Sequence, residues 1–158
     1  MKTAIVWFKT DLRLEDNETL VKAIAQSDQI IPLYCFDDSQ FTTTSYGFKK
    51  TGSFRAQFLL ESSQDLDNNL RQLGSGLIIV KGKPEVEIAK IAQQYKAFKV
   101  FAKREVAYEK NTERLVQNEL FKMRCELETF STSTLYHAED LPFSIKDIPD
   151  VFTNFRKK

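Results

Sequence analysis

The sequence predicts an α/β protein with a Rossmann-like, five-stranded parallel sheet that carries helices on both faces. Short apolar runs alternate along the chain with longer segments whose apolar residues recur at helical spacing, and this alternation is typical of βαβ units. Most of the intervening turns are short, so right-handed crossovers should connect strands of one sheet. With 158 residues, the chain can form one domain with a core of its own.

The predicted strands are either apolar throughout or alternate between apolar and polar residues. Continuous apolar runs fit strands that helices cover on both faces, whereas the alternation in residues 125–130 fits an edge or final strand. Pro32 lacks an amide donor and should lie near the start of its strand or at an unpaired position. The strands are expected at residues 3–8, 30–36, 77–80, 98–102 and 125–130.

A helix is expected after each of the first four strands, with start and stop signals in the sequence. Asn17 and Ser53 suit N-caps, Gly74 suits a helix end, and Pro84 suits a first turn. The first two helices are expected over residues 17–26 and 53–73. The predicted inward faces are Leu20, Val21 and Ile24; Phe54, Phe58, Leu59, Leu66, Leu70 and Leu73; Val86, Ala89, Ala92 and Tyr95; and Leu115, Val116 and Leu120.

The loops that follow the strands should all lie on one edge of the sheet, where α/β proteins usually bind ligands. The loop over residues 9–16 is charged and contains no glycine, so it does not resemble a pyrophosphate-binding loop. The loop over residues 37–52 is long for a compact domain, and such loops are commonly functional. The other two loops at this edge are residues 81–84 and 103–109.

Composition argues against several classes of protein. A net charge of +1 gives no electrostatic case for nucleic-acid binding by this chain. No apolar run approaches the roughly 20 residues that cross a bilayer, and the amino terminus enters a strand directly, without a secretory signal. Cys35 and Cys125 have no metal-ligand companions, and His137 has no partner spaced for a catalytic triad. We therefore expect a cytoplasmic protein with no membrane partner, metal site or catalytic residue.

Several motifs together resemble the photolyase/cryptochrome family, and the later ones most resemble its DASH-type cryptochromes. The resemblance covers the whole chain in one register. The motifs are residues 7–17 (WFKTDLRLEDN), 50–62 (KTGSFRAQFLLES), 82–85 (GKPE), 133–137 (STLYH), 140–143 (DLPF) and 148–157 (IPDVFTNFRK).

The resemblance implies that the chain is the amino-terminal domain of a two-domain flavoprotein. In that family a carboxy-terminal helical domain binds FAD and the cyclobutane pyrimidine dimer, and blue light drives electron transfer that repairs the lesion. DASH-type members act mainly on single-stranded DNA, where the lesion is flipped out at low cost, or act as blue-light receptors. Residues 1–130 would then be an antenna-binding domain, and residues 131–158 would begin a connector to the helical domain. The isolated chain is expected to lack deoxyribodipyrimidine photo-lyase activity and to reach DNA only through the full-length parent.

The resemblance also implies a crevice between the domains for a methenyltetrahydrofolate antenna. Glu109 is at the position where DASH-type members place a carboxylate against the pterin, whose 2-amino-pyrimidinone edge can donate two parallel hydrogen bonds. Its alternative role is that of a glutamate favoured by a helix N-terminus. Glu105 is either a second antenna contact or a solvated or inter-domain residue. Phe8, Lys9 and Thr10 are candidates to line the same crevice.

Two departures from the family pattern bear on this expectation. The family usually has Arg at position 9, and Lys9 keeps the charge but lacks the planar fork. Ser131 and Thr132 replace a usual Trp-Gly pair. Asp11 and Arg13 are expected to fix the first loop or to bridge to the helical domain.

Two other interpretations stay open at this stage. One is a free-standing nucleotide-binding domain that resembles electron-transfer flavoproteins or universal stress proteins, although no glycine-rich phosphate loop supports it. The other is an interaction module that docks through residues 131–158, which an exposed face of Val151, Phe152 and Phe155 would favour. That face belongs to a helix predicted from Asp150, and because it has little left to pack against, we expect the chain to be one piece of a longer protein.

Overall fold

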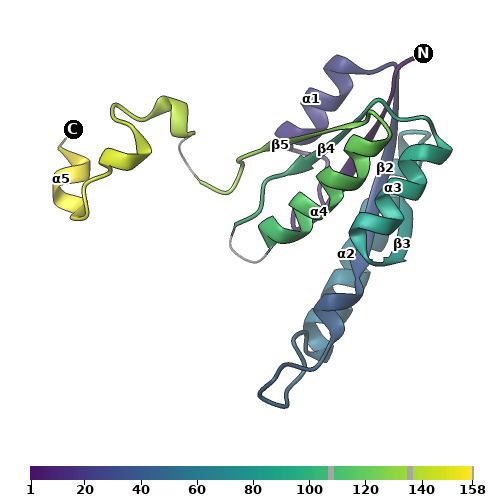
Figure 1. Ribbon diagram of the computed structural model, residues 1–158, viewed down its shortest axis with the longest axis horizontal. Coiled ribbons are helices and arrows are strands. Elements are labelled where there is room, and N and C mark those ends of the chain that lie inside the picture. Colours follow the sequence, from purple (N-terminus) through teal and green to yellow (C-terminus); the bar gives the residue numbers. More distant parts are fainter. Residues whose placement is uncertain (107–108, 135–136, 158) are drawn as a thin grey trace.

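The structure is a computed structural model that describes residues 1–106, 109–134 and 137–157. Within these residues, five strands form one parallel sheet in the order β3-β2-β1-β4-β5 (Figure 1). The strands are β1 (Thr3–Phe8), β2 (Gln29–Asp37), β3 (Ile78–Gly82), β4 (Lys99–Lys103) and β5 (Glu126–Phe130). The predicted fold class and strands are confirmed, and β5 lies at an edge.

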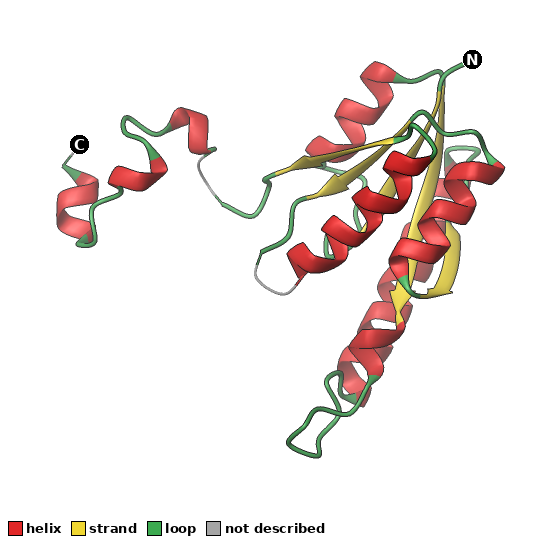
Figure 2. Cartoon of the chain, in the orientation of Figure 1, coloured by secondary structure: helices red, strands yellow, loops and turns green. Residues whose placement is uncertain are grey.

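Helices cover both faces of the sheet (Figure 2). Helices α1 (Glu18–Gln26) and α2 (Ser53–Gln72) contribute to the core cluster on one face, and α3 (Pro84–Gln94) and α4 (Glu109–Lys122) contribute to the cluster on the other. Shorter elements are the 3-10 turns η1 (Asp38–Phe41), η2 (Ala138–Asp140) and η3 (Ile145–Asp147), and helix α5 (Phe152–Arg156). In the part of the chain that the structure describes, no helix has both the length and the apolar character needed to span a membrane.

Strand β1 lies at the centre of the sheet, and all of its residues are buried. Ile5 and Trp7 point into the core cluster beneath α3 and α4, whereas Ala4, Val6 and Phe8 point into the cluster beneath α1 and α2. A strand with helices on both faces needs apolar side chains on both. The continuously apolar sequence of β1 follows from this position.

Pro32 lies near the start of its strand, as expected for a residue without an amide N–H donor. It is in register with Val6 of β1, and the pairing of β2 with β3 begins one residue later, at Leu33. Pro32 therefore lies in the stretch of β2 that has a neighbouring strand on one side only, where proline is tolerated.

Most of the predicted helix signals are found in the structure. The Asn17 side chain accepts a hydrogen bond from the Leu20 N–H at 3.1 Å and caps α1. Gly74 follows α2 with φ +74°, a left-handed conformation that favours glycine, and Pro84 is the first residue of α3. The prediction for Ser53 was wrong by one residue, because Gly52 is the N-cap of α2 and provides no side-chain hydrogen bond.

The predicted inward faces of α1, α3 and α4 are correct only in part. The buried residues of α1 are Thr19 and Ala23, so small side chains bring this helix close to the sheet. In α3 the fully buried Ile88 was not predicted. Helical spacing alone does not say which side of a mixed helix meets the sheet. The exposed members of the predicted faces are Val21, Ile24, Val86 and Leu115.

The predicted apolar stripe of α2 is buried over its second half only. Leu66 is 1% exposed and Leu70 is also buried, whereas Phe54 and Phe58 are 88% and 66% exposed; Leu73 at the far end is exposed as well. Twenty helical residues extend about 30 Å, whereas a strand of five residues extends about 17 Å. The first half of α2 therefore projects beyond the carboxyl edge of the sheet (Figure 1).

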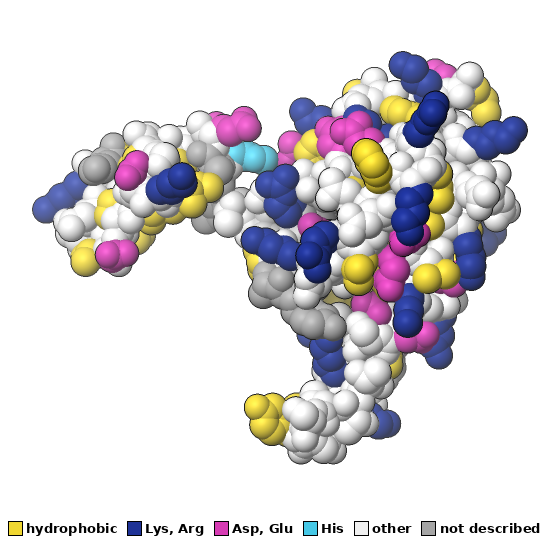
Figure 3. All heavy atoms as spheres, in the orientation of Figure 1, with side chains coloured by type: hydrophobic (Ala, Val, Ile, Leu, Met, Phe, Trp, Pro, Cys, Tyr) yellow, Lys and Arg dark blue, Asp and Glu magenta, His cyan; other side chains and the backbone are white. Residues whose placement is uncertain are grey.

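The long loop between β2 and α2 projects with this half of the helix (Figure 1). Thr43 and Lys49 form an isolated antiparallel bridge, which holds the loop as a narrow hairpin-like structure. Tyr46 and Phe48 are exposed near its tip, with their rings stacked at 6.2 Å between centroids. Apolar side chains are visible at this tip in Figure 3.

Residues 131–134 and 137–157 lie away from the sheet (Figure 1). The helix predicted over residues 150–158 is shorter than expected and comprises only α5. Phe155 packs edge-to-face against Phe143, with 5.5 Å between ring centroids, while Val151 and Phe152 are exposed.

We expect the two halves of the α2 stripe to respond differently to truncation. Leu66→Ala should lower the free energy of unfolding by about 2–5 kcal/mol, because it leaves a cavity in the core. Phe58→Ala should change that free energy by less than about 0.5 kcal/mol, because the ring is largely exposed. Urea unfolding followed by circular dichroism measures both variants, and similar losses in the two would contradict this division.

The two core cysteines should make stability depend on alkaline pH. Burial raises the pKa of Cys35 to about 12 and that of Cys125 to about 11. Above about pH 9 the unfolded chain releases thiol protons that the folded chain keeps, so the free energy of unfolding should fall as pH rises, by up to about 1.4 kcal/mol per pH unit and thiol.

Urea unfolding between about pH 8 and pH 10 under reducing conditions measures this decline. The variant Cys35→Ala/Cys125→Ala should lose stability less steeply than the wild type. Parallel declines would show that the thiols are not responsible.

Candidate functional site

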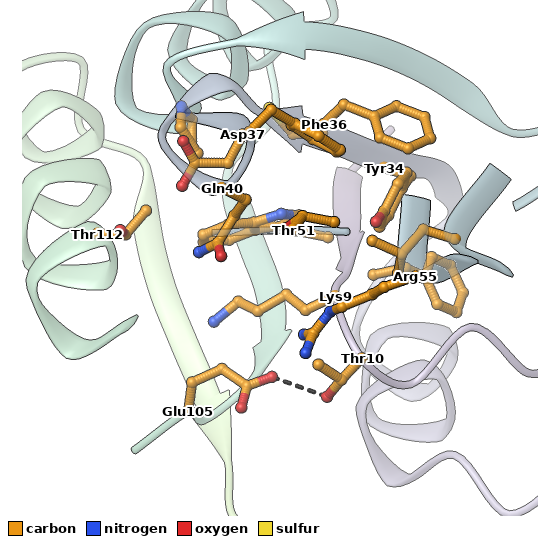
Figure 4. A pocket seen from close by; sticks show the side chains of 16 residues that line it. Lys9, Thr10, Tyr34, Phe36, Asp37, Gln40, Thr51, Arg55, Glu105 and Thr112 are labelled. Atoms are coloured by element: carbon orange, nitrogen blue, oxygen red, sulfur yellow. Dashed lines mark hydrogen bonds between the residues drawn. The ribbon is translucent and has the colours of Figure 1, made fainter. Parts of the chain in front are cut away.

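A cavity of about 140 Å³ opens at the carboxyl edge of the sheet. The ends of β1 and β2, the first half of α2 and the loop after β4 line it, as Figure 4 shows. Its apolar surface includes Trp7, Phe8, Tyr34 and Phe36. The cavity is therefore at the position where a parallel sheet is expected to bind ligands.

Four of the five candidate residues named from the sequence line this cavity: Phe8, Lys9, Thr10 and Glu105. Thr10 lies between two charged groups, because its hydroxyl donates to Glu105 Oε1 at 2.9 Å and accepts from Lys103 Nζ at 2.8 Å. These contacts join the loop after β1 to the end of β4.

The Lys9 side chain forms its contacts with other residues of this chain. Its ammonium donates to Glu113 Oε1 at 2.6 Å and to the Lys103 carbonyl at 2.8 Å, and it lies 4.3 Å from the centre of the Trp7 ring. The side chains of Lys9 and Glu113 are only 10% and 13% exposed. Burial lowers the pKa of Lys9, and the ion pair with Glu113 partly offsets that effect.

Glu109, the fifth candidate, is the first residue of α4, and its side chain is outside the described part of the structure. One turn further along this helix, Thr112 lines the cavity. The start of α4 therefore adjoins the cavity, but no contact of the Glu109 carboxylate is described.

The motif at residues 7–17 begins at the end of β1, and its remaining residues form a loop that is held by its own hydrogen bonds. Asp11 Oδ1 accepts from the Lys9 N–H at 2.9 Å, and Asn17 Nδ2 donates to the Arg13 carbonyl at 3.0 Å. Arg13 forms an exposed ion pair with Asp16 at 3.2 Å. Asp11 and Arg13 thus both form contacts within the loop, as the first of their two expected roles requires.

Sequence reasoning did not single out Arg55, Thr112 or Glu113. Arg55 lines both the cavity and a neighbouring groove of about 500 Å³ beside α2, and within the described residues its guanidinium has no ion pair. Glu113 lies one helical turn after Glu109, so helical spacing could have placed it on the same face. No spacing in the sequence indicated that Arg55 lies at the cavity, because its position depends on how far α2 projects beyond the sheet.

The described lining of the cavity offers surface for a flat, mostly apolar ligand. The raised pKa of Cys35 keeps this cavity-lining thiol protonated at neutral pH. His137 lies outside the cavity, with Nε2 3.6 Å from Glu18 Oε2. Among the residues that the structure describes, no cluster of three or more His, Cys, Asp or Glu could hold a metal ion.

Comparison with known proteins shows to which protein family the chain is related. The sequence model of the DNA photolyase family matches residues 4–158. A cryptochrome DASH from Gloeobacter violaceus is 43% identical over 99% of this chain, which spans 32% of that protein. One from Synechocystis is 44% identical over 98% of the chain, which again spans 32% of its length. The chain thus spans about a third of the length of these curated relatives.

Solved structures agree with the sequence comparison. A crystal structure of a Synechocystis cryptochrome superposes with a TM-score of 0.93 at 43% identity, covering 99% of this chain and 33% of that one. An archaeal photolyase from Sulfolobus tokodaii, at 23% identity and a TM-score of 0.78, shares the fold. The family resemblance expected from the sequence is confirmed: the chain belongs to the DNA photolyase family and corresponds to the α/β part of its DASH-type cryptochromes.

Proposed function

We propose that this chain forms one wall of a light-harvesting site for a methenyltetrahydrofolate antenna in a DASH-type cryptochrome or photolyase. The observation that carries the proposal is the cavity at the carboxyl edge of the sheet, where Phe8, Thr10 and Glu105 meet and beside which α4 begins at Glu109. When bound, such a chromophore absorbs light and transfers the excitation energy to a flavin.

The residues present fit a pterin ring chemically. Aromatic carbons of Trp7, Tyr34 and Phe36 offer flat apolar surface, against which a planar heterocycle packs well. The Glu109 carboxylate would accept hydrogen bonds from the 2-amino-pyrimidinone edge, with Glu105 as a second acceptor. We assign Phe8 and Thr10 to the lining and retain Lys9 as a neighbour of the ligand.

The size of the cavity supports a shared site. At about 140 Å³ it is smaller than the roughly 300–1,000 Å³ of typical small-molecule sites. The chain spans only a third of its relatives, so we propose that a carboxy-terminal helical domain forms the second wall. The isolated chain should therefore bind the folate weakly.

We assign the photochemistry of the whole protein to the proposed carboxy-terminal helical domain. We propose that residues 1–130 are the antenna-binding domain and that residues 131–158 begin the connector to the helical domain. That domain would bind FAD and use blue light to repair pyrimidine dimers, mainly in single-stranded DNA, or to signal. On the face shown in Figure 3, acidic and basic side chains are interspersed, which fits DNA binding through the full-length protein rather than through this chain.

A second candidate function is a docking module that acts through residues 131–158. The exposure of Val151 and Phe152 favours it, since exposed apolar groups commonly mark protein contacts. This function is compatible with the first, because a connector also docks. A free-standing nucleotide-binding domain has less support, since the loop after β1 contains no glycine.

Titration with methenyltetrahydrofolate tests the antenna site, and quenching of the single tryptophan, Trp7, provides the signal. We expect a Kd on the order of 100 μM or weaker. Glu109→Ala should weaken binding about tenfold or more, because it removes charge-assisted hydrogen bonds. Glu119→Ala, a change at a half-buried residue near the other end of α4, should not. Tight binding that Glu109→Ala leaves unaffected would refute the assignment.

The assignment of FAD to another domain is tested by the absorbance of the purified chain. We expect no flavin band and no repair of thymine dimers under blue light, because the cavity is too small for a dinucleotide. Reconstitution with excess FAD followed by gel filtration supplies the control. Stoichiometric flavin that stays with the chain would overturn the proposal.

A further inference from the structure

We propose that Glu113 is a positioning residue for the antenna site, and that Lys9 acts with it rather than by contacting the ligand. Together they hold the loop after β4, which carries Glu105, against the end of β1. This inference rests on the proposed antenna function and adds a residue to the same site.

The first argument is that other residues of this chain already contact the Lys9 ammonium. Glu113 Oε1 at 2.6 Å and the Lys103 carbonyl at 2.8 Å accept two of its hydrogen bonds, and the Trp7 ring lies 4.3 Å away. With a side chain only 10% exposed, Lys9 has little freedom to turn toward a ligand. Its position at the cavity is better explained by a structural contact than by binding.

The second argument is that Glu113 binds the loop as well as the lysine. The same oxygen, Oε1, accepts from the Glu105 N–H at 2.7 Å. The intervening residue is also held, because the Arg104 N–H donates to the Phe130 carbonyl at 2.7 Å. Three consecutive residues, 103–105, from the last residue of β4 into the loop, are therefore anchored through their backbones. Glu113 or its lysine partner provides two of these anchors.

The third argument concerns helix α4. Glu113 lies on this helix one turn after Glu109, and the adjacent Thr112 lines the cavity. The ion pair from Glu113 to Lys9, the first residue after β1, therefore sets the distance between the first turn of α4 and the cavity. Because one carboxylate fixes both the loop of Glu105 and the helix of Glu109, its loss should disturb both proposed folate contacts together.

The test compares Glu113→Gln with Glu119→Gln in the full chain. Glu119 is on the same helix and forms an exposed ion pair with Lys122 at 2.6 Å, so its loss controls for a changed charge on α4. Amide hydrogen exchange by NMR reports on the loop through the Glu105 N–H and on the core through Val100 and Phe101. Folate titration on the same samples gives the Kd.

In Glu113→Gln we expect exchange at Glu105 to accelerate at least tenfold while the two core amides keep their rates, and the folate Kd to rise about tenfold. Lys9→Met should reproduce both effects and Lys9→Arg, which retains a cation, should cause neither. Glu119→Gln should resemble the wild type.

Three results would overturn the positioning role. These are unchanged exchange at Glu105, equal acceleration at Glu105 and in the core, and selective acceleration at Glu105 with an unchanged folate Kd. If the wild type binds no folate at all, the antenna function fails and so does the part of this inference that concerns the ligand. The exchange data then decide separately whether Glu113 holds the loop.

Discussion

The parallel pairing of β1 with both of its neighbours is the constraint on which the rest of the structure depends. Because all five strands point the same way, the segments that follow them meet at one edge. Lys9 thereby reaches the Lys103 carbonyl, 94 residues away in the sequence. No local preference of either segment would bring these groups together, and the contacts that join the loops of the candidate site follow from this arrangement.

At that edge, most of the charge is satisfied within the chain. Lys9 pairs with Glu113, and the Thr10 hydroxyl lies between Lys103 and Glu105. Such contacts restrain the loops, because a buried ion that loses its partner is costly. What remains for a ligand is mainly aromatic surface, with Arg55 at the boundary of the cavity and the groove. This balance agrees with the proposal that the chain forms one wall of a binding site.

The strands and the helix ends could be predicted because their signals are local. Continuous apolar runs indicated strands buried on both faces, and Asn17, Gly74 and Pro84 indicated helix boundaries. The helix faces were predicted less well. Phe54 and Phe58 continue the spacing of Leu66, yet they lie beyond the end of the sheet. Periodicity describes a face of the helix, whereas burial also requires a partner opposite that face.

The sequence by itself determined the fold class, the order of the elements and the family, and it predicted the edge at which we propose that a ligand binds. Through the family resemblance it also named four residues that line the cavity. Only the tertiary structure decided that Lys9 is held by Glu113 and that half of α2 projects past the sheet. Both outcomes depend on distances between segments far apart in the chain, which pairing and packing set and residue spacing alone does not encode.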